Sequence, residues 1–439
     1  KAVVFGTTIL GSNPSAPAKY MFLDNKIKKI VSSIKHNFIP FYKEKEILKI
    51  FRILNSDNRK NAMFVGGCVR KYLLKEKIDD IDIATPLTPS EIIKKFHNSD
   101  FEIKKTGIQH GTLTLINQGK KYEITTLRED IATDGRHATV TFTNDWRKDS
   151  DRRDFTINAI YLDENGKLFD PHDGFSDLQK KQINFIGDAE QRIKEDYLRI
   201  LRFIRFTIQY DSEINPEVIK KIKLNLSGFK SISKERIYDE LLKILSLKNF
   251  PYLILKKKEL TEIFMLLFPE LKYLNRLKKF NKTLLNEISN ESIISLLVVD
   301  QSNNSEYFSY KYKISNKFKY KLNLLSKYLV EIRKNKNFFS DQIKKNLYLN
   351  GKNLMLELNL LTYFENKKKS LKDYQNINKK LNKITIPEFP YDGKFLIDKG
   401  LSEGKKIGRV LKLIEEKWLE NKFINLKDED IKKVIKRNI

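Results

Sequence analysis

Two aspartates two residues apart, Asp80 and Asp82, are the side chains of this sequence best suited to chemistry. The apolar residues Ile78, Ile81 and Ile83 bracket them, which predicts a strand with both carboxylates on one face. Two like charges held so close need a cation, and Mg²⁺ takes such oxygen ligands beside substrate phosphates. In isolation this pattern is more often a solvated acidic turn, so the flanking residues must decide between the two interpretations.

A glycine pair followed by an arginine precedes the aspartates. The apolar run at residues 62–65 predicts a strand, Gly66 and Gly67 a turn, and residues 69–74 the start of a helix. Backbone N–H groups and the helix dipole at such a turn can hold a phosphate. Arg70 lies three residues beyond Gly67 and could add its guanidinium to that site. On its own, a glycine pair is more often only a tight turn.

Two further groups could complete a site for metal and nucleotide. The adjacent Arg152 and Arg153 suit triphosphate oxygens, because guanidinium groups pair with phosphate in a bidentate manner. The alternative is a surface ion-pair cluster with Asp151 and Asp154. Glu123, in a later predicted strand, could be a third carboxylate ligand, or an ordinary exposed strand residue.

Residues 195–206 predict a helix that carries four charged side chains in steps of three. Asp196 and Arg199 are therefore expected to be neighbours on its surface. Arg202 and Arg205 continue the spacing, but each step turns about 60° around the helix. Asp196 and Arg205 are thus expected on roughly opposite faces, and one flat site could not hold all four. The alternative is a surface ion pair beside solvated arginines.

The elements that must position these residues change in character along the chain. Two amphipathic helices are predicted between residues 26 and 54. Strands and helices then follow in the order β, α, β, α, β, β up to residue 128, which predicts a small mixed sheet with helices on one side. Residues 128–150 predict a mobile charged loop, and from residue 189 almost everything is predicted to be helical. The expected fold class is α+β.

The amino-acid composition limits the classes of molecule that this chain could bind. The 84 Lys and Arg against 56 Asp and Glu give a net charge of +28 over 439 residues, which favours a polyanion, either nucleic acid or an anionic membrane surface. The single cysteine, Cys68, excludes an internal disulfide and a Cys-based zinc site. The sequence contains no run of eighteen or more apolar residues, so it predicts no membrane-spanning helix. Residues 1–25 have the outline of a signal or organellar targeting segment.

Several spaced motifs resemble the class II tRNA nucleotidyltransferases, which comprise bacterial-type CCA-adding enzymes and their poly(A) polymerase relatives. The resemblance runs from about residue 64 to residue 245, and residues 393–408 are similar to the family's tail more weakly. The motifs occur in the family's order, as Gly66-Gly67-Cys68-Val69-Arg70, Asp80-Ile81-Asp82, Asp151-Arg152-Arg153-Asp154-Phe155-Thr156-Ile157-Asn158, and Glu195-Asp196 with Arg199 and Arg202.

The resemblance implies a polymerase-β-like nucleotidyltransferase head followed by all-α neck, body and tail domains. The expected boundaries are an uncertain extension at 1–25, the catalytic head at 26–165, a neck for nucleotide selection at 166–230, and a tRNA-binding body at 231–385 and tail at 386–439. Mg²⁺ is implied on Asp80 and Asp82, with Glu123 as a further candidate. The residues implied for the incoming nucleotide are Gly67, Arg70, Arg153, Asp196, Arg199, Arg202 and Arg205.

The implied activity is the template-independent addition of C, C and A to tRNA 3′ ends from CTP and ATP, with release of pyrophosphate. A poly(A) polymerase or an enzyme that adds only A is the nearest alternative, and a non-catalytic RNA-binding protein is a remote one. Residues 107–112 and 134–137 resemble the tRNA enzymes more than the polyadenylating branch. The implied location is the cytoplasm, or an organelle if residues 1–25 are a targeting segment. The sequence does not indicate an oligomeric state.

One position departs from the family pattern. Lys71 follows Arg70 where the family usually has Asp. The substitution removes a carboxylate that could orient Arg70, but it affects neither of the two expected metal ligands.

Overall fold

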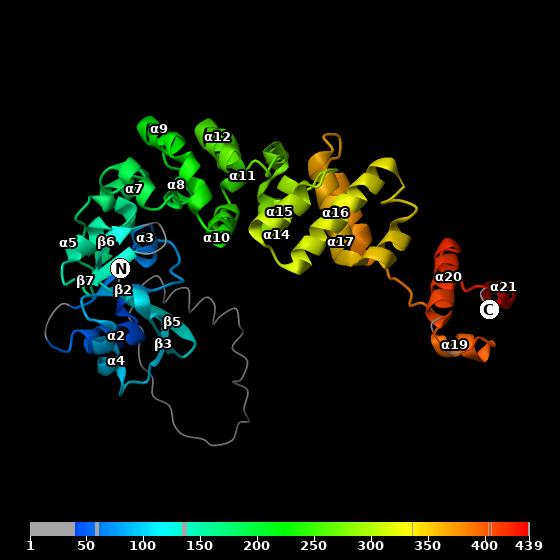
Figure 1. Cartoon of the computed structure of the whole chain (residues 1–439), viewed down its shortest axis with the longest axis horizontal. Helices are drawn as coiled ribbons and strands as arrows, with labels where there is room; N and C mark the ends of the chain where they lie inside the picture. Colours follow the sequence, from blue (N-terminus) through cyan, green and yellow to red (C-terminus); the bar gives the residue numbers. More distant parts are fainter. Residues whose placement is uncertain are drawn as a thin grey trace, which may run out of the picture. The chain divides into compact units, whose positions relative to one another are not determined.

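The computed structural model describes residues 40–57, 61–133, 138–335, 337–402, 404 and 406–437. The chain divides into two compact units, the first ending at Asp188 and the second beginning at Ala189 (Figure 1). Three predicted features lie outside the described residues: the extension at 1–25, the first of the two amphipathic helices, and residues 134–137.

A mixed sheet forms the centre of the first unit. Within the described residues it has seven strands in the order β3-β4-β5-β2-β1-β8-β9, of which only β2 and β5 pair in parallel. Their bounds are β1 (Met63–Val65), β2 (Asp82–Thr85), β3 (Glu102–Gly107), β4 (Thr112–Asn117), β5 (Lys120–Thr126), β8 (Tyr161–Leu162) and β9 (Leu168–Phe169).

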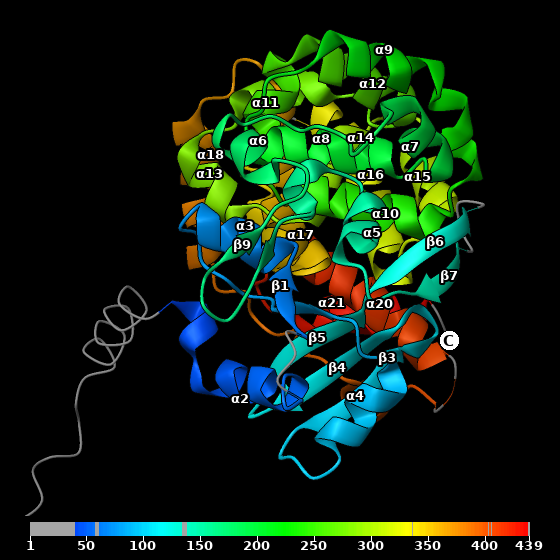
Figure 2. The same ribbon diagram turned by 90° about the vertical axis from the view of Figure 1, so that its left-hand side faces the viewer.

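The sequence prediction lacked β3. This strand lies at the edge of the sheet and exposes most of its side chains, so it carries no apolar alternation that would mark it. Figure 2 shows β3, β4 and β5 side by side.

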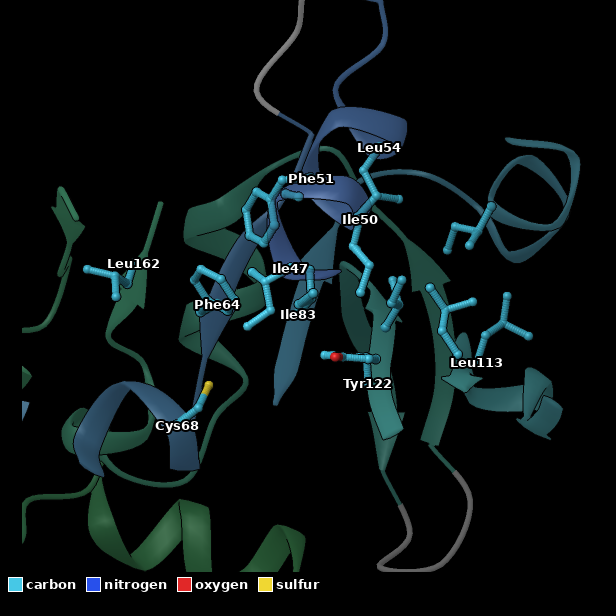
Figure 3. Close-up of a cluster of buried hydrophobic side chains, with 14 of the residues drawn as sticks. Ile47, Ile50, Phe51, Leu54, Phe64, Cys68, Ile83, Leu113, Tyr122 and Leu162 are labelled. Atoms are coloured by element: carbon cyan, nitrogen blue, oxygen red, sulfur yellow. The ribbon is translucent and has the colours of Figure 1, made fainter. Parts of the chain in front are cut away.

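The main core lies between one face of the sheet and the helices η1 (Phe41–Lys43), α2 (Lys45–Leu54), α3 (Gly67–Leu73) and α4 (Pro89–Phe96). Apolar residues of α2, which is the second predicted amphipathic helix, point at the strands, where Phe64, Ile83 and Tyr122 are buried (Figure 3). Helix α4 begins with a capping box between Thr88 and Glu91.

The opposite face of the sheet has a smaller cluster. Ala84 and Tyr161 are buried in it, and Trp146 packs against them. Because successive side chains of a strand point to opposite faces, Asp82 lies on the side of Ala84, away from the core that contains Ile83.

The described parts of the predicted loop, residues 128–133 and 138–150, are not a loop. Strands β6 (Arg128–Thr133) and β7 (Ala138–Phe142) form a separate two-stranded sheet, and α5 (Trp146–Asp151) follows. The prediction failed because these two strands are held by backbone pairing between largely polar residues, which leaves no apolar periodicity in the sequence. The helices η2 (Ile108–His110), η3 (Thr156–Asn158) and α6 (Gly174–Gln179) complete the unit.

Every element described in the second unit is a helix, as predicted. Around the proposed nucleotide-selecting residues these are α7 (Ala189–Glu195), α8 (Arg199–Gln209), α9 (Pro216–Leu224), η4 (Leu226–Ser231) and α10 (Lys234–Leu245), which Ser233 caps. There follow α11 (Phe250–Lys256), α12 (Lys258–Leu267), η5 (Leu274–Lys279), α13 (Lys282–Glu287), α14 (Asn290–Val298), α15 (Asn304–Tyr312), α16 (Asn316–Lys334), α17 (Ile343–Glu365) and α18 (Leu371–Lys383).

The last helices, α19 (Gly393–Asp398), α20 (Lys406–Glu420) and α21 (Asp428–Lys436), share a core of their own around Leu396, Val410 and Ile431. The division of this unit into neck, body and tail stays a prediction. Among the helices described, none is long and apolar enough to cross a membrane.

Candidate active site

The two aspartates converge on the glycine pair. A Cβ atom on Gly67 would lie 3.0 Å from Asp80 Oδ2, and one on Gly66 would lie 3.6 Å from Asp82 Oδ2. Strand β2 begins only at Asp82, so the prediction that one strand carries both aspartates was wrong. Asp80 precedes the strand, because regular pairing starts where the carbonyl of Ile81 accepts the N–H of Glu123 at 2.9 Å. Both carboxylates nevertheless lie against the same turn.

The predicted sequence of strand, glycine turn and helix is confirmed. Gly66 has φ 76° and ψ −127°, a backbone conformation that only glycine adopts without strain, and α3 begins at Gly67. Cys68 in α3 donates its thiol to the carbonyl of Val65, and burial raises the pKa of that thiol to about 12. The cysteine therefore packs the turn against the sheet and stays a neutral thiol.

Asp82 is the electrostatically unusual member of the pair. Burial raises the pKa of its carboxyl to about 6, and the negative charges of Asp80 and Glu123 add to this effect. The positive charges of Arg153 and Arg70 oppose it. A cation beside Asp82 would favour its ionised form, as a metal-binding carboxylate requires.

Glu123 stands directly across the parallel β2–β5 register from Asp82, and its side chain is exposed. The described residues contain no group of three or more His, Cys, Asp and Glu side chains that could hold a metal ion. Glu123 as a metal ligand stays a prediction.

Lys71 lies at the same site. Its ammonium forms ion pairs with Asp79 and, at 2.8 Å, with Oδ1 of Asp80. Sequence reasoning identified Lys71 as a departure from the family, but it did not anticipate a contact with an expected metal ligand.

The expected phosphate-binding arginines of the first unit are held by other side chains. Arg70 donates to Oδ1 of Asn158. Arg153 donates to Asp149 Oδ2 and to the hydroxyl of Tyr161, both at 3.0 Å, and that hydroxyl donates to Asp149 at 2.7 Å. This network holds the guanidinium of Arg153, whose positive charge acts on Asp82.

Asp149 pairs with both adjacent arginines, and the ion-pair alternative, which named Asp151 and Asp154, did not include it. Asp149 is 1% exposed, and although burial acts to raise its pKa, the charges of Arg153 and Arg152 hold that pKa well below its usual range. Sequence reasoning missed this residue because it fell in a stretch predicted to be a loop. Its spacing of three and four residues from the arginines was the available signal.

In the second unit, the expected continuous helix at 195–206 is interrupted. Helix α7 ends at Glu195 and α8 begins at Arg199, with Asp196 in the break. The Asp196 side chain accepts the N–H of Leu198 at 3.1 Å, and its carbonyl accepts that of Arg199 at 3.0 Å. Aspartate competes in this way with helical hydrogen bonds, so the prediction failed despite a correct apolar period.

The side chains of Asp196 and Arg199 each bind to other residues. Arg199 donates to Glu195 and to the carbonyl of Arg192, both at 2.7 Å. Asp196 Oδ2 accepts from Arg236 of α10 at 2.7 Å.

The other two expected arginines follow on α8. Arg205 pairs with Glu240 of α10 and lies 4.2 Å from the ring centroid of Phe206, while Arg202 lies 5.6 Å from the same ring. Arg236 and Glu240 are one helical turn apart, so a single face of α10 holds both Asp196 and Arg205. Sequence reasoning missed both α10 residues, because their partners are 35 to 40 residues away.

Comparisons with known proteins identify the family of this chain. Residues 62–184 match the family described as "Poly A polymerase head domain", and residues 213–274 match the one described as "Probable RNA and SrmB- binding site of polymerase A". The human protein "CCA tRNA nucleotidyltransferase 1, mitochondrial" is 33% identical over 376 residues, which cover 83% of this chain and 84% of the human one. The chain belongs to the CCA tRNA nucleotidyltransferase family.

Two further proteins of this family support the assignment. The CCA-adding enzyme of Staphylococcus haemolyticus (strain JCSC1435) is 32% identical over 391 residues, which cover 86% of this chain and 94% of that protein. The crystal structure of the Bacillus stearothermophilus CCA-adding enzyme in complex with CTP matches with a TM-score of 0.72 at 26% identity, over 90% of this chain and 97% of that one. The expected family, the fold class and the expectation of a nucleotidyltransferase are confirmed.

Proposed function

We propose that this nucleotidyltransferase adds C, C and A to the 3′ ends of tRNA from CTP and ATP, without a nucleic-acid template, and releases pyrophosphate. The observation that carries the proposal is the convergence of Asp80 and Asp82 on one glycine turn, in a chain that matches CCA-adding relatives over most of its length. The net charge of +28 suits a tRNA substrate.

The donor set suits Mg²⁺, because both side chains offer carboxylate oxygens and the glycines leave the space that a Cβ atom would fill. Asp80 and Asp82 would hold the ion. Bound there, Mg²⁺ supplies activation of the RNA 3′-hydroxyl and stabilisation of charge on the α-phosphate and the leaving pyrophosphate. Arg70 and Arg153, whose charges already act on Asp82, are proposed to neutralise the triphosphate at the same place.

Nucleotide choice is assigned to Asp196 and Arg199. An acceptor and a donor side by side can pair with the amino group and ring nitrogen of cytosine or adenine, whereas uracil and guanine present the reversed pattern. Each polar group left unpaired would cost about 1 to 3 kcal/mol, which is enough for discrimination. Existing hydrogen bonds to Arg236 and Glu195 support this role, since they hold both side chains in place without a nucleotide.

The remaining predicted ligands take supporting roles in the proposal. Gly67 lets the chain approach the phosphates, and Arg202 adds positive charge on α8. Arg205 was expected to bind nucleotide as well, but its pair with Glu240 favours a role in positioning α8. The helices beyond residue 231 are assigned to tRNA binding.

The decisive experiment incubates tRNA that lacks its 3′ end with CTP, ATP or both, and sequences the products. We expect two C residues with CTP alone, and C, C and A followed by termination with both. Asp80→Asn and Asp82→Asn should abolish addition while tRNA binding is retained. Long A tails would instead identify a poly(A) polymerase, and A addition only to tRNA that already ends in CC would identify an A-adding enzyme.

The cytoplasm is the proposed location, and an organelle is the alternative if residues 1–25 act as a targeting segment. The mitochondrial name of the human relative supports the alternative. Fusion of residues 1–40 to a fluorescent protein distinguishes the two.

A further inference from the structure

Lys71 brings a permanent cation to one of the two proposed metal-binding carboxylates. Its ammonium contacts Asp79 and lies 2.8 Å from Oδ1 of Asp80. The Lys71 side chain is 22% exposed, against 55% for Asp80 and 68% for Asp79, so the ammonium is sheltered between two more open carboxylates. A lysine between two acidic groups is fully charged at neutral pH.

The two oxygens of Asp80 have different surroundings. Oδ1 accepts from Lys71, whereas Oδ2 faces Gly67, on the turn that Asp82 Oδ2 approaches at Gly66. An ion held by Asp80 and Asp82 from the glycine side would therefore share Asp80 with the ammonium. Two cations on one carboxylate repel each other, and partial exposure weakens this repulsion without abolishing it.

Asp79 is a second carboxylate that can bind the Lys71 ammonium. It already contacts Lys71, and it is the neighbour of Asp80 in the chain. Lys71 can therefore keep one carboxylate contact after giving up Asp80, at little cost in charge pairing.

We propose that Lys71 competes with the catalytic metal ion for Asp80, and that Asp79 receives the ammonium when the metal binds. This inference rests on the proposed function, which assigns Asp80 and Asp82 to the metal. Its consequence is a site that binds metal weakly on its own. A nucleoside triphosphate, whose negative charge offsets both cations, restores the affinity, so that metal and nucleotide enter together.

The test measures binding of Mn²⁺ to the full chain, without nucleotide or tRNA, by the electron paramagnetic resonance signal of free Mn²⁺. Removing the competing charge with Lys71→Met is expected to tighten binding about tenfold. Lys71→Arg, which keeps the charge, should remain close to the wild type. The matched control is Lys77→Met, at an exposed lysine in the connection between α3 and β2, and it should leave the affinity unchanged.

The role of Asp79 has its own variants. Asp79→Asn confines the ammonium to Asp80 and should weaken Mn²⁺ binding. Combined with Lys71→Met, the same change should have little further effect, because no ammonium remains to be received. A loss of equal size in both backgrounds would mean that Asp79 attracts the metal directly, and would overturn its proposed role.

Equal affinities for Lys71→Met and Lys77→Met would overturn the competition, and so would weaker binding by Lys71→Met. Lys71→Gln repeats the test if Lys71→Met does not fold, as judged by circular dichroism. Asp80→Asn in the Lys71→Met background separates this inference from the proposed function. If that variant still binds Mn²⁺ as tightly as Lys71→Met, the metal assignment itself is wrong, whatever the role of Lys71.

Discussion

Arg236 Nη2 on α10 lies 2.7 Å from Asp196 Oδ2, in the break between α7 and α8. The other oxygen of the same carboxylate accepts the backbone N–H of Leu198. Both oxygens are thus held in one orientation by the protein. A carboxylate that selects a base by hydrogen bonding gains from such preorganisation, because binding then costs less conformational entropy.

Arg236→Ala should release Asp196 and reduce nucleotide discrimination. We expect the ratio of kcat/KM for CTP or ATP to that for UTP or GTP to fall about tenfold, the equivalent of one hydrogen bond to a charged group. Asp196→Ala should lower the ratio further. Steady-state kinetics with each nucleotide on tRNA primers provide the measurement.

The control for this prediction is Asp239→Ala, at an exposed residue of the same helix. It should leave both rate and selectivity unchanged. If Arg236→Ala lowers the rate with every nucleotide equally, Arg236 does not act through base selection.

The first unit shows which parts of the site can be predicted from sequence. Gly66, Asp80 and Asp82 were found because their local spacing carries the chemical signal. Asp149 was missed, although it is near Arg153 in sequence, because the polar strands that precede it give no periodic pattern.

The second unit shows a different limit. The apolar period of residues 195–206 is helical, and only the competition of the Asp196 side chain for backbone N–H groups ends one helix and starts the next. Partners such as Arg236 and Glu240 come from another helix, and no local spacing indicates a contact over such a separation. Helix formers and core residues are predictable from local pattern, whereas tertiary ion pairs are not.

Gly67→Ala tests the close approach of Asp80 to the glycine turn. The new Cβ would lie 3.0 Å from Asp80 Oδ2, so the carboxylate must shift by a few tenths of an ångström. Misplacing a group that is proposed to bind the metal is costly to catalysis, and we expect kcat to fall at least about tenfold with little change in thermal stability. Gly408→Ala, where a Cβ meets nothing within 4 Å, is the control. Wild-type kcat in Gly67→Ala would show that the contact is not needed.

Asp149→Asn tests the buried ion pairs behind Arg153. Removing one partner of a buried pair leaves an uncompensated charge, so we expect a loss of about 3 to 5 kcal/mol in unfolding free energy at pH 7. Asp151→Asn, at a half-exposed residue two positions on, should cost less than about 1 kcal/mol. Urea unfolding can be followed by Trp146, which lies 5.5 Å from the ring of Tyr161, in a Trp418→Phe background.

In acid, the unfolding free energy of Asp149→Asn should come closer to that of the wild type. The folded-state pKa of Asp149 lies below its unfolded value, so its contribution is complete above about pH 4 and is lost as the pH falls from there. The stability difference between wild type and Asp149→Asn should therefore begin to shrink as the pH falls below the unfolded pKa of about 4, and should keep shrinking until the pH reaches the folded-state pKa. A difference independent of pH would show that packing, and not charge, is lost.

The pair of Arg205 and Glu240 decides between two roles for Arg205. Their side chains are 14% and 2% exposed, so each single alanine variant leaves a poorly solvated charge. A double-mutant cycle should give a coupling of about 1 to 3 kcal/mol in unfolding free energy, measured by urea and circular dichroism. The surface pair of Lys223 and Glu262, in the same unit, should give less than about 1 kcal/mol.

Kinetics on the same variants complete the argument. If Arg205 acts by positioning α8, Glu240→Ala should raise KM for CTP and ATP as much as Arg205→Ala does, and the double variant should add little to either. If Arg205 instead binds the nucleotide directly, a different result is expected, because the nucleotide loses a cation only when Arg205 is replaced. If adding Arg205→Ala to Glu240→Ala raises KM further, Arg205 binds the nucleotide directly. That result would contradict the positioning role.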